Sequence, residues 1–103
     1  MSKKILQLNF RFNVTAAEYE GAVDPLAQAI ADVPGLVWKV WFLNEAEREA
    51  GGIYLFDDES SAKAFLEGDL AAKVTGHPAL SDFSVKLFDV MEKQTAVTRG
   101  PVG

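Results

Sequence analysis

The chain of 103 residues carries strand-like and helix-like hydrophobic patterns in a definite order. Residues 4–12 alternate strictly between apolar and polar side chains, which predicts a β-strand. Residues 16–33 place apolar side chains three and four positions apart, which predicts an amphipathic helix. Strand patterns follow at 34–42, 51–56 and 80–91, with helical segments at 60–67 and 69–75 between the last two. The order β-α-β-β-α-β predicts an α+β, ferredoxin-like split β-α-β fold with a four-stranded antiparallel sheet and helices on one face.

Local signals predict where the helices begin and end. Thr15 and Glu18 have the spacing of a capping box, so we expect the first helix to begin near residue 16. Pro25 has no amide hydrogen for the helix and therefore predicts a bend or a second start. Asp57 or Asp58 can cap the next helix, which Gly68 should end.

The hairpin formed by residues 34–42 and 51–56 is apolar on both faces, so both faces need a cover. Strand alternation divides the sheet into two sets, and we expect the purely apolar one to pack under the helices. That set is Leu6, Leu8, Phe10, Phe12, Trp38, Val40, Phe42, Ile53, Leu55, Phe83, Val85 and Leu87. The opposite set is Gln7, Asn9, Arg11, Val37, Lys39, Trp41, Leu43, Tyr54, Phe56, Lys86, Phe88 and Val90. Aromatic side chains mixed with cations and amides are typical of an interface, so we expect a second subunit there.

Composition narrows the classes of function. The net charge of −5, with no basic cluster beyond Lys3 and Lys4, argues against nucleic acid and against an anionic membrane surface. The chain has no cysteine and one histidine, which removes disulfides, thiolate nucleophiles and the usual metal clusters. Gly51 and Gly52 open a strand and do not form a phosphate loop. We therefore expect a cytoplasmic protein without metal, flavin or haem.

The length of the chain predicts a single folded domain, which we place at residues 1–92. The remaining segment, residues 93–103, is rich in small and polar residues, so it is predicted to be frayed or to lie on a partner subunit.

Several stretches resemble a known family. Trp38-Lys39-Val40-Trp41 and Ala50-Gly51-Gly52-Ile53-Tyr54-Leu55-Phe56 are the most specific, and the resemblance runs from about residue 5 to residue 92. These blocks resemble the YdhR-like putative monooxygenase family of the dimeric α+β barrel superfamily. The resemblance implies a homodimer whose two sheets face each other. It also implies oxygenation of a small phenolic or quinol-like compound without a cofactor.

Such a reaction needs an apolar pocket with aromatic walls and a group that stabilises a phenolate. No residue is assigned a catalytic role from the sequence. The pocket candidates are Phe10, Tyr19, Trp38 and His77 on the expected helix side, and Asn9, Lys39 and Tyr54 on the opposite side. The candidates for the dimer face are Arg11, Trp41, Phe56, Lys86 and Phe88. We expect a ligand to contact Trp38 and its neighbours, and Lys39 to complete a polar network across the dimer.

Three alternatives stay open. The aromatic residues can be ordinary packing, and His77, set between Gly76 and Pro78, can be a surface-turn residue. The protein can be a non-catalytic module that binds a small apolar or aromatic ligand in the same pocket. A haem-binding relative is a third alternative, disfavoured by the position of His77 in a turn.

Overall fold

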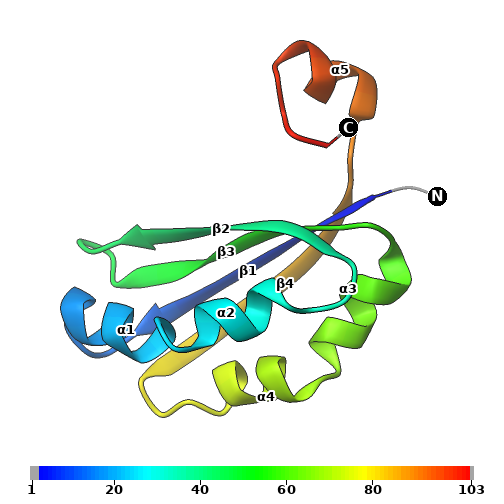
Figure 1. The fold of residues 1–103 in the computed structure, drawn as a ribbon. Helices are drawn as coiled ribbons and strands as arrows, with labels where there is room; N and C mark the ends of the chain where they lie inside the picture. Colours follow the sequence, from blue (N-terminus) through cyan, green and yellow to red (C-terminus); the bar gives the residue numbers. More distant parts are fainter. Residues whose placement is uncertain (1–2, 103) are drawn as a thin grey trace.

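The computed structural model describes residues 3–102 and contains a four-stranded antiparallel sheet with four of its helices on one face (Figure 1). In chain order the elements are β1 (Lys4–Phe12), α1 (Ala16–Val23), α2 (Leu26–Ala31), β2 (Leu36–Asn44), β3 (Glu49–Phe56), α3 (Glu59–Leu66), α4 (Asp69–Thr75), β4 (Leu80–Asp89) and α5 (Glu92–Val97). The strands are arranged β2-β3-β1-β4. This is the ferredoxin-like split β-α-β arrangement, and the predicted fold class is confirmed.

The helix ends follow the local signals of the sequence. At the start of α1, the Glu18 amide donates to Thr15 Oγ1 at 3.1 Å, and Glu18 Oε1 accepts from the Thr15 amide at 3.1 Å. This reciprocal pair is the predicted capping box. The helical segment is interrupted at Pro25, so that α1 ends at Val23 and α2 begins at Leu26. Asp58 caps α3 by accepting from the Ser61 amide at 2.8 Å.

Aromatic side chains fill the core between the sheet and the helices. Tyr19 of α1 stacks on Phe12 with ring centroids 5.2 Å apart and also contacts Phe10. On the other side of the core, Phe65 of α3 meets Tyr54 and Phe56 of β3 at 5.1 and 5.7 Å. These contacts fix helices from both halves of the chain against the central strands β1 and β3.

The predicted faces of the hairpin strands β2 and β3 were wrong. Register with the core residues of β1 decides the face: Leu6 is opposite Tyr54 and Leu8 is opposite Gly52. Across the hairpin, Lys39 is opposite Tyr54 and Trp41 is opposite Gly52. Because side chains alternate along a strand, an error of one position inverts the whole set. Tyr54, Phe56, Lys39, Trp41 and Leu43 therefore face the helices, whereas Trp38, Val40, Phe42, Ile53 and Leu55 lie on the opposite, open face.

The error has a physical cause. We assigned the purely apolar set to the helix side, but the helix side of β3 combines small residues, Ala50 and Gly52, with large ones, Tyr54 and Phe56. The small residues leave room there for the side chains of β2, including that of Lys39. For β1 and β4 the predicted faces are correct: Arg11, Lys86 and Phe88 lie on the open face.

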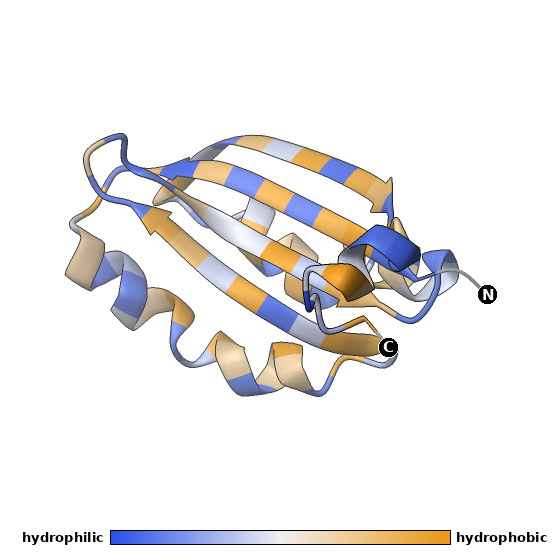
Figure 2. Ribbon diagram, turned by 90° about the horizontal axis from the view of Figure 1, so that it is seen from above, coloured by the Kyte–Doolittle hydropathy of each residue, from blue (hydrophilic) through white to orange (hydrophobic). Residues whose placement is uncertain are grey.

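The C-terminal residues contact the chain's own sheet, so they are not frayed, which was one of the two expectations for this segment. Helix α5 stands over one end of the open face (Figures 1 and 2). Beyond it, the Pro101 carbonyl accepts a 2.9 Å hydrogen bond from the Trp38 indole, and Val102 is only 5% exposed. Leu55, which is paired with Trp38 across the hairpin, is fully buried. We call residues 98–102 the C-terminal hook.

Candidate functional site

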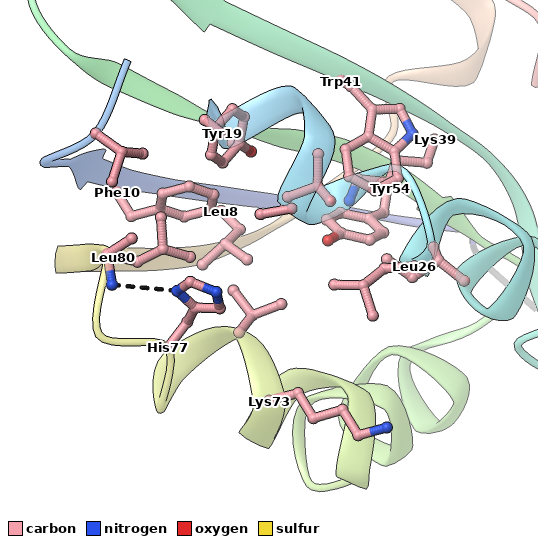
Figure 3. Close-up of a pocket in the computed structure, with 17 residues that line it drawn as sticks. Leu8, Phe10, Tyr19, Leu26, Lys39, Trp41, Tyr54, Lys73, His77 and Leu80 are labelled. Atoms are coloured by element: carbon pink, nitrogen blue, oxygen red, sulfur yellow. Dashed lines mark hydrogen bonds between the residues drawn. The ribbon is translucent and has the colours of Figure 1, made fainter. Parts of the chain in front are cut away.

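A cavity lies between the helix side of the sheet and helices α1, α2 and α4 (Figure 3). Its walls are mainly aliphatic and aromatic. The lining residues are Leu8, Phe10, Val14, Tyr19, Ala22, Val23, Leu26, Ile30, Lys39, Trp41, Gly51, Tyr54, Lys73, Val74, His77, Ala79 and Leu80. Its volume is about 40 Å³, enough for a few water molecules. An aromatic ligand would therefore require lining side chains to move.

Lys39 is the distinctive member of this lining. Its Nζ lies 3.3 Å from the centroid of the Trp41 ring and 4.4 Å from that of Tyr54, so the amine sits between two aromatic faces. Among residues 3–102, no ion pair or side-chain hydrogen bond involves this amine. Burial disfavours the charged form and lowers the pKa of Lys39 to about 7. Both the neutral and the protonated amine are therefore populated near neutral pH.

The position of Lys39 depends on Gly52 across the hairpin. A β-carbon at residue 52 would overlap Cε of Lys39 and would lie 3.3 Å from its Nζ. The glycine thus leaves a groove along β3 in which the lysine side chain lies. The sequence indicated a close backbone approach at this glycine but did not identify Lys39 as the group that approaches.

Two tyrosines add polar atoms to the apolar walls. Tyr19 comes from α1 and Tyr54 from β3, and both side chains are buried. Burial raises the pKa of Tyr19 to about 12 and moves the pKa of Tyr54 upward as well. Both hydroxyls therefore stay protonated at neutral pH, when they can donate or accept hydrogen bonds.

His77 lines the same cavity from the turn after α4. Its Nδ1 accepts a hydrogen bond of 3.1 Å from the Ala79 amide, which Figure 3 shows as a dashed line. In the neutral ring the proton therefore resides on Nε2, which becomes the donor. His77 lies in a turn, as the flanking Gly76 and Pro78 predicted, and also reaches the cavity.

Trp41 separates the cavity from a larger surface hollow. This hollow has a volume of about 350 Å³ and lies between α1, α2 and β2; Tyr19, Val23 and Trp41 border both spaces. Glu20 and Asp24 contribute carboxylates to the outer hollow. Trp41 thus lies at the boundary between the cavity and this hollow, together with Tyr19 and Val23.

The structure brings five of the seven pocket candidates into the cavity: Phe10, Tyr19, Lys39, Tyr54 and His77. Trp38 and Asn9 are on the open face instead. There, Asn9 accepts from Gln7 Nε2 at 2.9 Å and donates to Glu49 Oε2 at 3.0 Å.

Trp41, which we had placed on the dimer face, is part of the cavity, and Phe56 is a core residue under the helices. The pairing of the largest side chain, Trp41, with Gly52 across the hairpin was the sequence signal that could have identified this wall.

Neither a metal centre nor a membrane-spanning helix emerges from the described part of the chain. Residues 3–102 contain no group of three or more His, Cys, Asp or Glu side chains placed to hold a metal ion. Within the same residues, every helix is too short or too polar to cross a bilayer.

The fold and the cavity define the class: a ferredoxin-like α+β protein with a mostly apolar site between sheet and helices. Residues 5–101 match the family described as "Putative mono-oxygenase ydhR", and the chain belongs to this family. The match includes most of the C-terminal hook. Curated protein sequences give no match to the chain.

Solved structures share the fold at low sequence identity. SnoaB from Streptomyces nogalater, a cofactor-independent oxygenase, is 20% identical with a TM-score of 0.71, covering 87% of this chain and 94% of its own. A dimeric ferredoxin-like protein of unknown function from Thermobifida fusca is 20% identical with a TM-score of 0.66, covering 87% and 93%. The heme-degrader MhuD from Mycobacterium tuberculosis is 18% identical with a TM-score of 0.65, covering 84% and 95%.

Proposed function

We propose that this protein is a homodimeric, cofactor-independent monooxygenase that acts on a small phenolic or quinol-like compound. The observation that carries the proposal is the Lys39 amine, which lies between the Trp41 and Tyr54 rings with no carboxylate partner among residues 3–102. An enclosed cation without a counter-ion suits a ligand that brings its own negative oxygen. Membership of the monooxygenase family supports the same reaction class.

Lys39 would serve as both base and counter-ion. A neutral amine whose conjugate acid has a pKa of about 7 can accept the phenol proton at working pH, and the resulting ammonium then holds the phenolate. A phenolate is electron-rich and can pass electrons to dioxygen without flavin or metal. For a simple phenol, one oxygen atom replaces hydrogen on ring carbon to give a quinone, and the other leaves as water. The substrate supplies all four electrons, so no external reductant is required.

Substrate entry would require Trp41 to move. The present cavity is too small for an aromatic ring, whereas the adjoining hollow is several times larger. The carboxylates of Glu20 and Asp24 border that hollow and disfavour anions. A neutral phenol is therefore the species expected to enter, with its proton removed only beside Lys39.

The open sheet face would form the homodimer contact. It carries exposed Val40 and Phe88 together with Lys86 and Arg11, a mixture of apolar and polar side chains suited to an interface. The Thermobifida fusca protein of the same fold is a dimeric ferredoxin-like protein, which supports this assembly.

Oxygen consumption tests the proposed reaction. Oxygen uptake by the purified protein would be measured with phenols, hydroquinones and hydroxynaphthalenes as candidate substrates. The same reactions would be run under ¹⁸O₂, and the masses of the products would be determined by mass spectrometry. We expect one labelled oxygen per product and a rate that falls about 10²- to 10⁴-fold in Lys39→Met, the usual contribution of a general base. Lys63→Met is the matched control, because Lys63 is exposed at the surface and does not line the cavity.

The non-catalytic alternative has its own outcome. If a phenol raises the melting temperature but neither oxygen consumption nor ¹⁸O incorporation follows, the cavity is a binding site and the oxygenase proposal is wrong.

A further inference from the structure

Lys39 differs in its surroundings from three other lysines of the chain, Lys4, Lys63 and Lys73. The Lys4 amine pairs with Asp89 and Glu59, and the Lys63 amine lies 3.0 Å from Glu59. Lys73 borders the cavity, but Figure 3 shows its amine directed away from it. Lys39 alone among these four has its amine against aromatic rings and inside the apolar cavity. A primary amine in such surroundings is a potential nucleophile as well as a base.

We propose that Lys39 Nζ is an imine-forming nucleophile that captures small apolar aldehydes entering the cavity. This activity goes beyond oxygenation and does not depend on it, since it needs neither dioxygen nor a phenolic group. The aldehyde class follows from the lining: one amine to attack a carbonyl carbon, surrounded by aliphatic and aromatic side chains that would hold an apolar body.

The reaction is balanced with no further reactant. The nitrogen lone pair attacks the carbonyl carbon, the C=O π electrons move to oxygen, and proton transfer from nitrogen to oxygen gives a carbinolamine. The hydroxyl then leaves with a proton as water while the second N–H proton is lost, and the C=N bond forms. One amine and one aldehyde thus give one imine and one water. The Tyr54 hydroxyl and His77 Nε2 are cavity groups that can supply the proton to the departing hydroxyl.

Two properties of the site favour this capture over reaction at the surface lysines. Burial keeps about half of the Lys39 side chains neutral at pH 7, because its pKa is about 7. An ordinary lysine with a pKa near 10.4 has less than about one neutral amine in a thousand at that pH. In addition, the apolar walls limit the water that would hydrolyse the imine.

Reductive trapping tests the proposal. The full chain would be incubated at pH 7 with acetaldehyde or benzaldehyde and sodium cyanoborohydride, and each alkylated lysine would be quantified by peptide mass mapping. We expect Lys39 to be modified at least about tenfold faster than Lys63 or Lys73. Acetaldehyde is small enough to enter without a large rearrangement, and benzaldehyde tests whether an aromatic body is accepted.

The variants separate capture from simple exposure. Lys39→Arg keeps a cation and should lose the fast modification, while Lys63→Met, at an exposed lysine outside the cavity lining, should leave the Lys39 rate unchanged. Unfolding the wild-type chain in urea before labelling should abolish the preference for Lys39. If acetaldehyde modifies folded Lys39 no faster than Lys63 and Lys73, the proposal is overturned. Fast capture of acetaldehyde but not benzaldehyde would confirm the nucleophile and restrict its ligands to small aldehydes.

Discussion

At the scale of single residues, the free energy of burying Lys39 determines what the cavity can do. Desolvation destabilises the ammonium form of Lys39. Cation–π attraction to the Trp41 and Tyr54 rings, worth about 0.5–2 kcal/mol, offsets only part of this free-energy cost. The Lys39 ammonium is therefore more easily deprotonated than that of a solvent-exposed lysine. An uncharged side chain such as Met at this position has no ammonium to remove from water, so stability alone does not explain the residue.

The protonation of Lys39 should make stability depend on pH. Its folded-state pKa of about 7 is below the unfolded value of 10.5, so between these values the unfolded chain binds more protons. The free energy of unfolding should then rise as pH increases from 7 to 10, by about 1.4 kcal/mol for each unit of pKa difference, less the cation–π offset. Below pH 7 both states are protonated and the full destabilisation is present.

Urea unfolding of wild type and Lys39→Met between pH 6 and 10 measures this effect. Lys39→Met should be the more stable protein at pH 6, and the difference should shrink toward pH 10. The comparison cancels the titration of the other groups around the cavity, namely Tyr19, Tyr54, Lys73 and His77, and of Glu20 and Asp24 in the adjoining hollow. Parallel pH profiles for the two proteins would contradict a buried, easily neutralised amine.

At the scale of elements, β2 separates two environments. Its Trp41 faces the cavity, while its Trp38 faces the open side and holds the C-terminal hook through the Pro101 carbonyl. Because β2 is an edge strand, the hook covers part of a sheet margin that would otherwise be open to solvent or to another chain.

Two conservative substitutions should therefore have different effects. Trp38→Phe removes the indole donor, so it should destabilise the fold by about 1 kcal/mol and make residues 98–102 more sensitive to protease, with little effect on ligand binding. Trp41→Phe should instead change the ligand-induced shift in melting temperature and leave the hook protected. Loss of ligand binding in Trp38→Phe with normal binding in Trp41→Phe would contradict the face assignment.

Among the elements, short-range features could be predicted from the sequence, whereas the faces of β2 and β3 could not. Element order, the Thr15 cap and the break at Pro25 are short-range properties, and they were predicted because their causes lie within a few residues. The faces of β2 and β3 depend on register with β1, a long-range property. Both hairpin faces are rich in apolar residues, so hydrophobicity could not decide between them. Five pocket candidates nevertheless meet in the cavity, because aromatic and cationic residue types were selected irrespective of face.

At the scale of the whole molecule, one sheet face is covered by helices and the other is covered only at one end, by α5 and the hook. A chain of this size hides a limited share of its surface, so burying the open face against a second copy would add substantial stability. The exposed Val40 and Phe88 on that face are the side chains that gain most from such burial.

Light scattering after gel filtration tests this assembly. The wild-type protein should have twice the chain mass of 11.2 kDa at micromolar concentration. Val40→Glu places a charge on the open face and should give monomers. Val85→Glu is the matched control: Val85 is 44% exposed but lies on the helix side, so this variant should stay dimeric. A wild-type monomer, or dissociation by both variants alike, would contradict the proposed contact.

The position of the two tryptophans on opposite sides of β2 also has an optical consequence. They are the chain's only indoles, three residues apart, with one beside the cavity amine and the other hydrogen-bonded to the hook. With the neighbouring indole replaced by phenylalanine, the fluorescence of Trp41 would report events in the cavity, and that of Trp38 would report changes on the open face. A single strand thus provides two intrinsic reporters, and ligand entry and subunit contact can be followed separately without attaching a dye.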